Sequence, residues 1–281
     1  MFYAVLLGKY FSELCKRGGT GNIHSVFERA INVELAEEGL FTLLAGGAGG
    51  NAAGETDIMP ASCIAAAPAG SWEKIIRTGS GVLLTPDIVY VENIPVVGNI
   101  SAAALWEKLS TREINDLTKP AYAQLLTVCE ELENYLDKTG KGETLPTPPL
   151  CDFKAENFIG AGLGLTPSGD DFLAGMLHGI HFMESLYGKK CPYLPKITRT
   201  ISANLQGAGT ISRHFLSFAL NGEWGRSTEN VLVRLVSGDK QKLYNAVNAK
   251  LAYGASSGAD ELRGCLFGIR ENLMSTTPKP V

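Results

Sequence analysis

The chain has 281 residues, of which 45% are hydrophobic and 19% are charged, and its net charge at pH 7 is −4. This length predicts one large domain or two small ones, and the composition excludes a disordered chain. The balance of 29 acidic against 25 basic residues argues against nucleic-acid binding, and no apolar run of about 18 residues is present to span a membrane.

Cysteine spacing indicates the redox compartment. The six cysteines are widely separated and form no Cys-x-x-Cys pair; they are Cys15, Cys63, Cys129, Cys151, Cys191 and Cys265. This pattern is typical of reduced thiols rather than of a disulfide framework or a zinc site. We therefore expect a cytoplasmic globular protein.

Residues 1–100 are predicted to form a β-rich N-terminal domain. One long strand is expected over Ile23–Leu35, because its odd positions supply most of one apolar face. Shorter strands are expected at Phe41–Leu44, Val82–Thr85 and Ile88–Glu92.

Residues 101–281 are predicted to form an α-helical domain. The clearest helix is Lys119–Asp137, with Thr118 as its expected N-cap. Further helices are expected at Asp170–Leu186, Pro195–Leu220, Ser227–Ser237, Gln241–Leu251 and Ala259–Leu273. A β-rich region followed by helices predicts the α+β class rather than a doubly wound sheet.

A loop and the start of a helix are duplicated within the second domain. Thr166–Ile180 and Ala255–Ile269 match at eight of 15 positions with a constant offset of 89. The matching pairs are Ser168/Ser257, Gly169/Gly258, Asp171/Asp260, Leu173/Leu262, Gly175/Gly264, Leu177/Leu266, Gly179/Gly268 and Ile180/Ile269. Two copies are too few for a solenoid, which needs about three or more, so we expect two equivalent helices inside one domain.

One interpretation of the repeat is purely structural. Each Ser-Gly-x-Asp segment resembles a capping box with Asp in place of Glu or Gln, and acidic side chains in a first turn favour the helix dipole. The glycine pairs Gly175/Gly179 and Gly264/Gly268 are four residues apart, which would let two helix backbones approach closely.

The other interpretation is a ligand site at the two helix N-termini. A glycine-rich loop before a helix exposes N–H groups that suit phosphate or carboxylate; the residues expected to bind such an anion are Gly162, Gly164, Thr166, Gly169, Ser257 and Gly258. The carboxylates of Asp170, Asp171 and Asp260 would then hold Mg²⁺, a cationic group or an amide. The glycine spacing matches neither a P-loop nor a dinucleotide fingerprint.

Arg213 and His214 lie between the repeats. Arg213 is expected either to pair with a substrate carboxylate or phosphate or to neutralise the Asp cluster, and the spacing leaves both open. A lone histidine beside Phe215 and Phe218 favours a structural role for His214 over an acid–base one.

Three segments together resemble the bacterial AllH-like family. Gly162–Asp171, followed by Leu173 and Gly175, resembles its glycine-rich signature, Gly254–Gly264 resembles its C-terminal motif, and Val26–Val33 is similar to its N-terminal strand. The segments occur in the family's order across nearly the whole chain.

The resemblance implies a subunit of oxamate carbamoyltransferase, which converts oxalurate and phosphate into oxamate and carbamoyl phosphate during allantoin breakdown. It also implies partner subunits related to acyl-CoA synthetases. For this activity we expect Ser168, Asp170, Asp171 and Asp260 as catalytic residues. The hydroxyl of Ser168, Thr166 or Ser257 is expected to stabilise an oxyanion. If a metal ion takes part, we expect Mg²⁺ bound by Asp170 and Asp171. A non-catalytic scaffolding or ligand-binding subunit is the alternative, and a carboxylase, the family's older description, ranks third.

Overall fold

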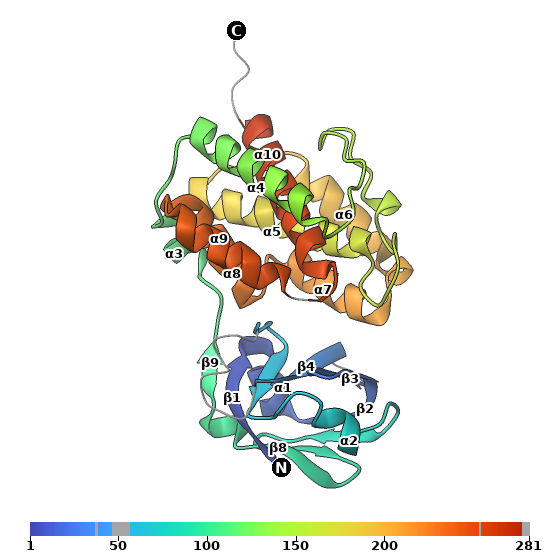
Figure 1. Ribbon diagram of the computed structural model, residues 1–281. Helices are drawn as coiled ribbons and strands as arrows, with labels where there is room; N and C mark the ends of the chain where they lie inside the picture. Colours follow the sequence, from blue (N-terminus) through green and yellow to red (C-terminus); the bar gives the residue numbers. More distant parts are fainter. Residues whose placement is uncertain (37–38, 47–56, 253, 277–281) are drawn as a thin grey trace. The chain divides into compact units, whose positions relative to one another are not determined.

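The computed structural model describes residues 1–36, 39–46, 57–252 and 254–276 (Figure 1). The chain divides into two compact units, Met1–Lys108 and Leu109–Val281. The first unit is rich in strands and the second is mostly helical. The predicted α+β class, with a β-rich region preceding a helical one, is therefore confirmed.

The first unit is a closed β-barrel. Its strands are β1 (Phe2–Gly8), β2 (Gly19–Val26), β3 (Ala30–Leu35), β4 (Gly39–Ala45), β5 (Ser62–Ala65), β6 (Gly81–Leu84), β7 (Val89–Val91), β8 (Ile94–Gly98) and β9 (Ala104–Trp106). They are ordered β5-β4-β3-β2-β6-β7-β8-β1-β9, and an additional antiparallel pairing of β1 with β5 closes the ring. The helices α1 (Lys9–Arg17) and α2 (Trp72–Ile75) also belong to this unit.

Alternating strand residues and one face of α1 fill the barrel. Ile31, Val33 and Phe41 are fully buried, and Phe11 of α1 meets Phe41 edge-on with 5.2 Å between ring centroids. Trp72 of α2 is also fully buried and packs on Phe2. The core of this unit is therefore formed by residues spread over its entire length.

The single long strand expected over Ile23–Leu35 is wrong, because the segment folds into the antiparallel pair β2 and β3. The chain reverses after Val26, where the Phe27 N–H donates to the Ala30 carbonyl at 2.8 Å. Phe27 itself is 39% exposed. Alternation continues on both sides of the turn, which is why the pattern resembled one strand.

The second unit contains α3 (Thr111–Asn115), α4 (Tyr122–Thr139), α5 (Ser168–Tyr187), α6 (Leu194–Asn204), α7 (Thr210–Leu220), α8 (Arg226–Ser237), α9 (Lys240–Leu251) and α10 (Ser257–Thr276). The helix expected over Pro195–Leu220 is two helices, because the chain leaves the helical path between Leu205 and Gly209. The expected cap at Thr118 is also wrong: α4 begins after Ala121, since Pro120 and Ala121 precede the first helical turn.

The helices α5 and α10 pack in parallel through their glycines. A Cβ atom built on Gly175 would collide with the carbonyl oxygen of Glu261, and one on Gly179 with that of Cys265. The reciprocal contacts involve the equivalent residues of the repeat, Gly264 against Phe172 and Gly268 against Met176. The residue numbers of the contacting positions increase in the same direction along both helices, from Gly175/Glu261 to Gly179/Cys265. The helices α5 and α10 are therefore parallel, and the reciprocal contacts relate them by a local pseudo-twofold axis.

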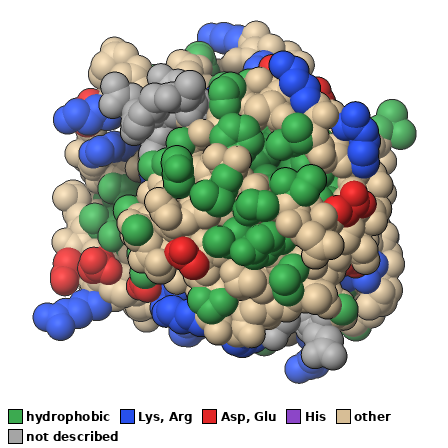
Figure 2. Space-filling model, turned by 90° about the horizontal axis from the view of Figure 1, so that it is seen from below, with side chains coloured by type: hydrophobic (Ala, Val, Ile, Leu, Met, Phe, Trp, Pro, Cys, Tyr) green, Lys and Arg blue, Asp and Glu red, His purple; other side chains and the backbone are tan. Residues whose placement is uncertain are grey.

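Surface chemistry adds two observations. None of the helices in the described ranges is long and apolar enough to cross a lipid bilayer. Apolar side chains gather on the face seen in Figure 2, and the barrel exposes large apolar side chains at Met1, Tyr3, Leu83 and Ile94.

Candidate functional site

The two repeats meet at the N-terminal ends of α5 and α10. The Thr166 hydroxyl, just before α5, lies 2.8 Å from the hydroxyl of Ser257, the first residue of α10. Parallel packing thus brings together two residues that were predicted to share a site although 91 positions separate them. The capping boxes do not form as expected at α5: its N-cap is Pro167, so Ser168 is already helical and supplies no side-chain cap.

Two of the predicted acidic residues hold loops against the helices. Asp170 is 2% exposed, and its Oδ1 accepts the Gly160 N–H at 2.8 Å. Asp260 is 1% exposed, and its Oδ1 accepts the Glu143 N–H at 2.7 Å. Burial raises the pKa of Asp170, while the Gly160 N–H and the Ser212 hydroxyl lower it. Each helix therefore fixes a preceding loop through one buried carboxyl group.

Asp171 occupies a different environment from its neighbour Asp170. Burial raises the pKa of Asp171 to about 8, assisted by the charges of Glu261 and Asp260 and opposed by the Ser257 hydroxyl and Lys250. Its Oδ2 is buried and has no hydrogen-bond partner within the described ranges. Asp171 is therefore largely protonated at neutral pH.

A buried ionic network lies beside Asp171. Lys250 of α9 is 2% exposed, and its Nζ lies 2.6 Å from Oε2 of Glu261. The Thr228 hydroxyl donates to Glu261 Oε1 at 2.5 Å, and His178 Nδ1 lies 3.2 Å from the same oxygen. Burial alone would raise the pKa of Glu261, but Lys250 and His178 lower it well below its usual range.

Both ring nitrogens of His178 have hydrogen-bond partners. Its Nε2 lies 3.1 Å from the Glu223 carbonyl oxygen, which can only accept, so Nε2 carries a hydrogen. Its Nδ1 lies 3.2 Å from Glu261 Oε1. Both ring nitrogens are therefore engaged, and His178 joins α5 to α10.

This network was missed at the level of sequence. Its members come from α5, α8, α9 and α10 and share no spacing. The one available signal was Glu261, which stands in the repeat where the first copy has the apolar Phe172. A charged residue at an apolar position of a repeat indicates a buried partner.

The glycine-rich loop before α5 presents unpaired N–H groups. Gly162 and Gly164 adopt positive φ values of 112° and 98°, and Leu163 between them is 91% exposed. Within the described ranges no acceptor pairs with the N–H groups of residues 162–165. The Gly169 N–H is already used, since it donates to the Ala161 carbonyl at 2.8 Å, and the Gly169 Cα packs against Phe158. Gly258 is buried in the first turn of α10.

Arg213 and Ser212 border this loop from the start of α7. The Ser212 hydroxyl lies 3.5 Å from the Leu165 carbonyl oxygen, and Arg213 Nη2 donates to the Ala208 carbonyl at 3.2 Å. Arg213 makes no ion pair with a carboxylate among the described side chains, and its buried Nε has no partner there. Neutralisation of the Asp cluster by Arg213 is therefore not seen. Burial lowers the pKa of neighbouring His214 to about 4, so this histidine is neutral.

A shared metal ion does not fit Asp170 and Asp171. The carboxyl group of Asp170 is bound by Gly160 and Ser212, whereas that of Asp171 faces Ser257 and Lys250. Among the residues that the structure describes, no group of three or more His, Cys, Asp or Glu side chains is arranged to hold a metal. The lysine beside Asp171 also disfavours a second cation there.

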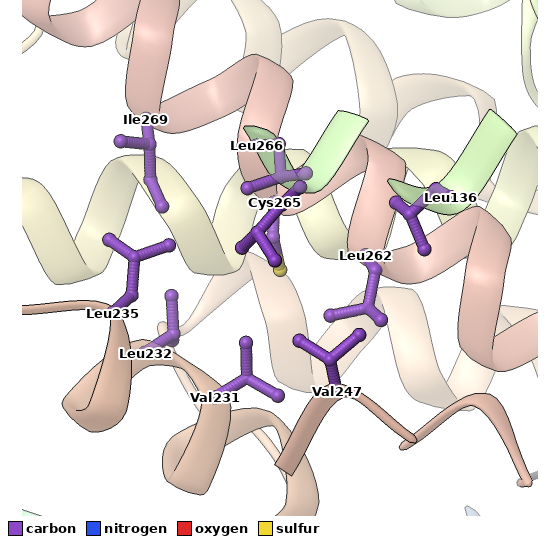
Figure 3. A pocket seen from close by; sticks show the side chains of 10 residues that line it. Leu136, Val231, Leu232, Leu235, Val247, Leu262, Cys265, Leu266 and Ile269 are labelled. Carbon is purple, nitrogen blue, oxygen red and sulfur yellow. The ribbon is translucent and has the colours of Figure 1, made fainter. Parts of the chain in front are cut away.

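A small cavity in the helical unit is not suited to an anionic ligand. It lies between α4, α8, α9 and α10 (Figure 3), and only apolar side chains and Cys265 line it. The lining residues are Leu132, Leu136, Val231, Leu232, Leu235, Val247, Leu262, Cys265, Leu266 and Ile269. We assign it to core packing.

Two family models match the sequence. Residues 3–104 match the AllH family N-terminal domain, and residues 158–269 match the model described as oxamate carbamoyltransferase subunit AllH. The chain belongs to the AllH family. No curated protein and no solved structure gives a match. The first model covers the barrel. The second covers the chain from the glycine-rich loop before α5 to Ile269 of α10, so the N-termini of α5 and α10 both lie within the matched region.

Proposed function

We propose that this AllH-family chain is a subunit of a cytoplasmic oxamate carbamoyltransferase complex and that its site lies at the joined N-termini of α5 and α10. The observation that carries the proposal is the Thr166–Ser257 contact, because it joins polar residues of both repeats inside the region matched by the family model. The six free cysteines fit a reducing compartment.

The reaction requires two anions to be held close together. Phosphate oxygen attacks the carbamoyl carbon of oxalurate, a C–O bond forms, and the C–N bond to oxamate breaks as that nitrogen takes up the proton released by phosphate. The unpaired N–H groups of residues 162–165 suit phosphate. Arg213, with no carboxylate of its own among the described side chains, suits the oxalurate carboxylate.

Hydroxyl groups at the helix ends suit the negative charge that develops on the carbamoyl oxygen. Thr166 and Ser257 already share a hydrogen bond, so one of the two hydroxyl hydrogens is free to point toward a ligand. Ser168 is 4% exposed, and it is the remaining candidate donor. Preorganised donors of this kind stabilise a tetrahedral intermediate.

The test is phosphate-dependent cleavage of oxalurate by the purified chain, alone and with its partner subunits, for which relatives of acyl-CoA synthetases are the candidates. We expect activity in the complex, and we expect Thr166→Ala together with Ser257→Ala to lower kcat at least 10-fold. Asp170→Asn with Asp260→Asn should also reduce activity, with circular dichroism as the folding control. Full activity in both double variants would remove this site assignment.

A scaffolding subunit is the second candidate. It is favoured by the loop-anchoring hydrogen bonds of Asp170 and Asp260, which a purely structural repeat would also use. Thermal shift separates the two functions, because a ligand at about 100 times its Kd stabilises a protein by about 2.7 kcal/mol. Unchanged melting curves with oxalurate, oxamate, carbamoyl phosphate and Mg²⁺ would favour the scaffold.

A further inference from the structure

Asp171 and Asp260 are equivalent residues of the repeat and lie on the helix contact stripe. Each stands one turn before the first glycine of its stripe, Gly175 or Gly264. Residues four apart share a helix face, so both carboxyl groups lie at the same end of the α5–α10 contact. Their proximity is also electrostatic, since the charge of Asp260 raises the pKa of Asp171.

Each of the two carboxyl groups has one oxygen without a partner. The Oδ2 atoms of Asp171 and Asp260 are both buried and unpaired within the described ranges. Asp260 is only 1% exposed, and its other oxygen, Oδ1, accepts the Glu143 N–H. Buried acceptors in folded proteins are nearly always satisfied, so a neighbouring pair of open acceptors indicates a missing donor.

The charge around the pair selects a neutral donor over a cation. Lys250 already acts on Asp171 and lowers its pKa, and its Nζ lies 2.6 Å from Glu261 Oε2. A further cation would be repelled by this lysine. With the Asp171 proton on Oδ1, toward the Ser257 hydroxyl, the Oδ2 atoms of Asp171 and Asp260 are both acceptors. An uncharged group with two N–H bonds is complementary to them.

We propose that the Oδ2 atoms of Asp171 and Asp260 bind the NH₂ of the carbamoyl group and make this chain specific for carbamoyl over acyl ligands. The inference rests on the proposed function, because it assigns a part of the same site. The Ser257 hydroxyl acts on Asp171 and lies 2.8 Å from the Thr166 hydroxyl, so the carbonyl oxygen and the NH₂ of one carbamoyl group have separate candidate partners.

Access to the pair requires the segment around Gly142 and Glu143 to move. The Glu143 N–H binds Asp260, and a Cβ on Gly142 would lie 2.8 Å from Asp260 Oδ1. This segment precedes α5 in a stretch without regular structure, between Gly140 and Pro149. A ligand therefore reaches the pair only when the segment of Gly142 and Glu143, which is bound to Asp260 Oδ1, moves away from it.

The test compares carbamoyl phosphate with acetyl phosphate, in which a methyl group replaces the NH₂. Binding is measured calorimetrically with the full chain, alone and in complex with its partner subunits. A site built to bind N–H groups rejects an analogue that lacks them by large factors, so we expect carbamoyl phosphate to bind at least about 100-fold more tightly.

Matched variants locate the preference. Asp171→Asn and Asp260→Asn keep one carbonyl oxygen for the existing partner and turn a donor toward the ligand, so each should lower the preference about 10-fold or more, which corresponds to about 1.4 kcal/mol. Glu184→Gln is the control, because Glu184 is a buried carboxyl group of α5 that accepts a backbone N–H, from Cys191, away from the pair; the ratio of the two affinities should not change.

The outcomes separate the inference from the proposed function. Equal binding of the two phosphates by the wild type, or a preference that survives in both pair variants, overturns the inference and leaves the proposed anion site standing. Failure of either phosphate to bind contradicts the proposed function as well.

Discussion

The Cα of Gly175 lies directly against the carbonyl oxygen of Glu261, so that even a methyl group at residue 175 would occupy the position of that oxygen. Glu261 is also the centre of the buried ionic network. The position of the network's central carboxylate thus depends on the close approach of two helix backbones.

We expect Gly175→Ala and Gly264→Ala each to lower the free energy of unfolding of the helical unit by about 2–3 kcal/mol. Overpacking a rigid contact costs about 1–3 kcal/mol, and here the added Cβ would lie 1.9 Å (Gly175) or 2.0 Å (Gly264) from a carbonyl oxygen. Urea unfolding followed by circular dichroism measures the effect. Gly209→Ala is the control: its nearest neighbour is 3.8 Å away, so a loss of about 1 kcal/mol or less is expected at this N-cap. Equal losses in all three variants would argue against the close contact.

The Lys250–Glu261 pair should be strongly coupled. Removing one partner leaves an uncompensated buried charge, so we expect Lys250→Met or Glu261→Gln alone to cost about 3–5 kcal/mol. The double variant should lose clearly less free energy of unfolding than the two single variants together, because neither charge of the pair is then buried without its partner. A double-mutant cycle in urea measures this, and additive losses would show that the two side chains do not interact.

Asp171 should make stability depend on pH. Its pKa rises from 3.8 to about 8 on folding, so between these values the folded protein retains a proton that the unfolded chain has released. The free energy of unfolding therefore falls as pH rises through this window. Asp171→Asn should remove this contribution and be stabilised relative to wild type at the alkaline end.

The measurement is Tm against pH for both proteins. The contribution of Glu261, whose pKa is lowered on folding, has the opposite sign, since it stabilises above the usual Glu pKa and is lost on acidification. It is present in both proteins and cancels in their difference. Parallel curves for the two proteins would contradict a buried, protonated Asp171.

Arg213 should act on substrate binding. We expect Arg213→Ala to raise KM for oxalurate about 10- to 100-fold, because a charged hydrogen bond contributes about 1.5–3 kcal/mol, with a smaller effect on kcat. Steady-state kinetics of the complex checks this. Arg199→Ala on α6 serves as the control for loss of a positive charge, and a similar KM change there would point to a general electrostatic effect.

Local sequence patterns predicted which segments form strands and helices better than they predicted the turns that interrupt them. The burial of Ile31, Val33 and Leu35 follows the predicted alternation. A turn at Phe27 is compatible with the same alternation, so the pattern did not predict it. The glycines of the repeat predicted close helix packing, and the observed contacts of Gly175 and Gly264 agree with it.

The contacts of the candidate site were predictable only where the chain repeats itself. The match between their segments predicted that Thr166 and Ser257 lie close together, whereas Lys250 and His178 reach Glu261 from separate helices through tertiary packing. Sequence spacing carries no information on such contacts. The burial of Asp170 and Asp260, and therefore their role in holding loops, likewise depends on segments distant in sequence.

The strand β1 has its partners late in the chain. It pairs with β5, β8 and β9, which end at residues 65, 98 and 106. During synthesis β1 can pair with β5 only once residue 65 has left the ribosome, and its pairings with β8 and β9 wait until nearly the whole of Met1–Lys108 has done so. Non-local pairing of this kind slows folding, so the barrel is expected to form in one late cooperative step, and a chain truncated before Ala104 would leave the end of β1 without its last neighbour.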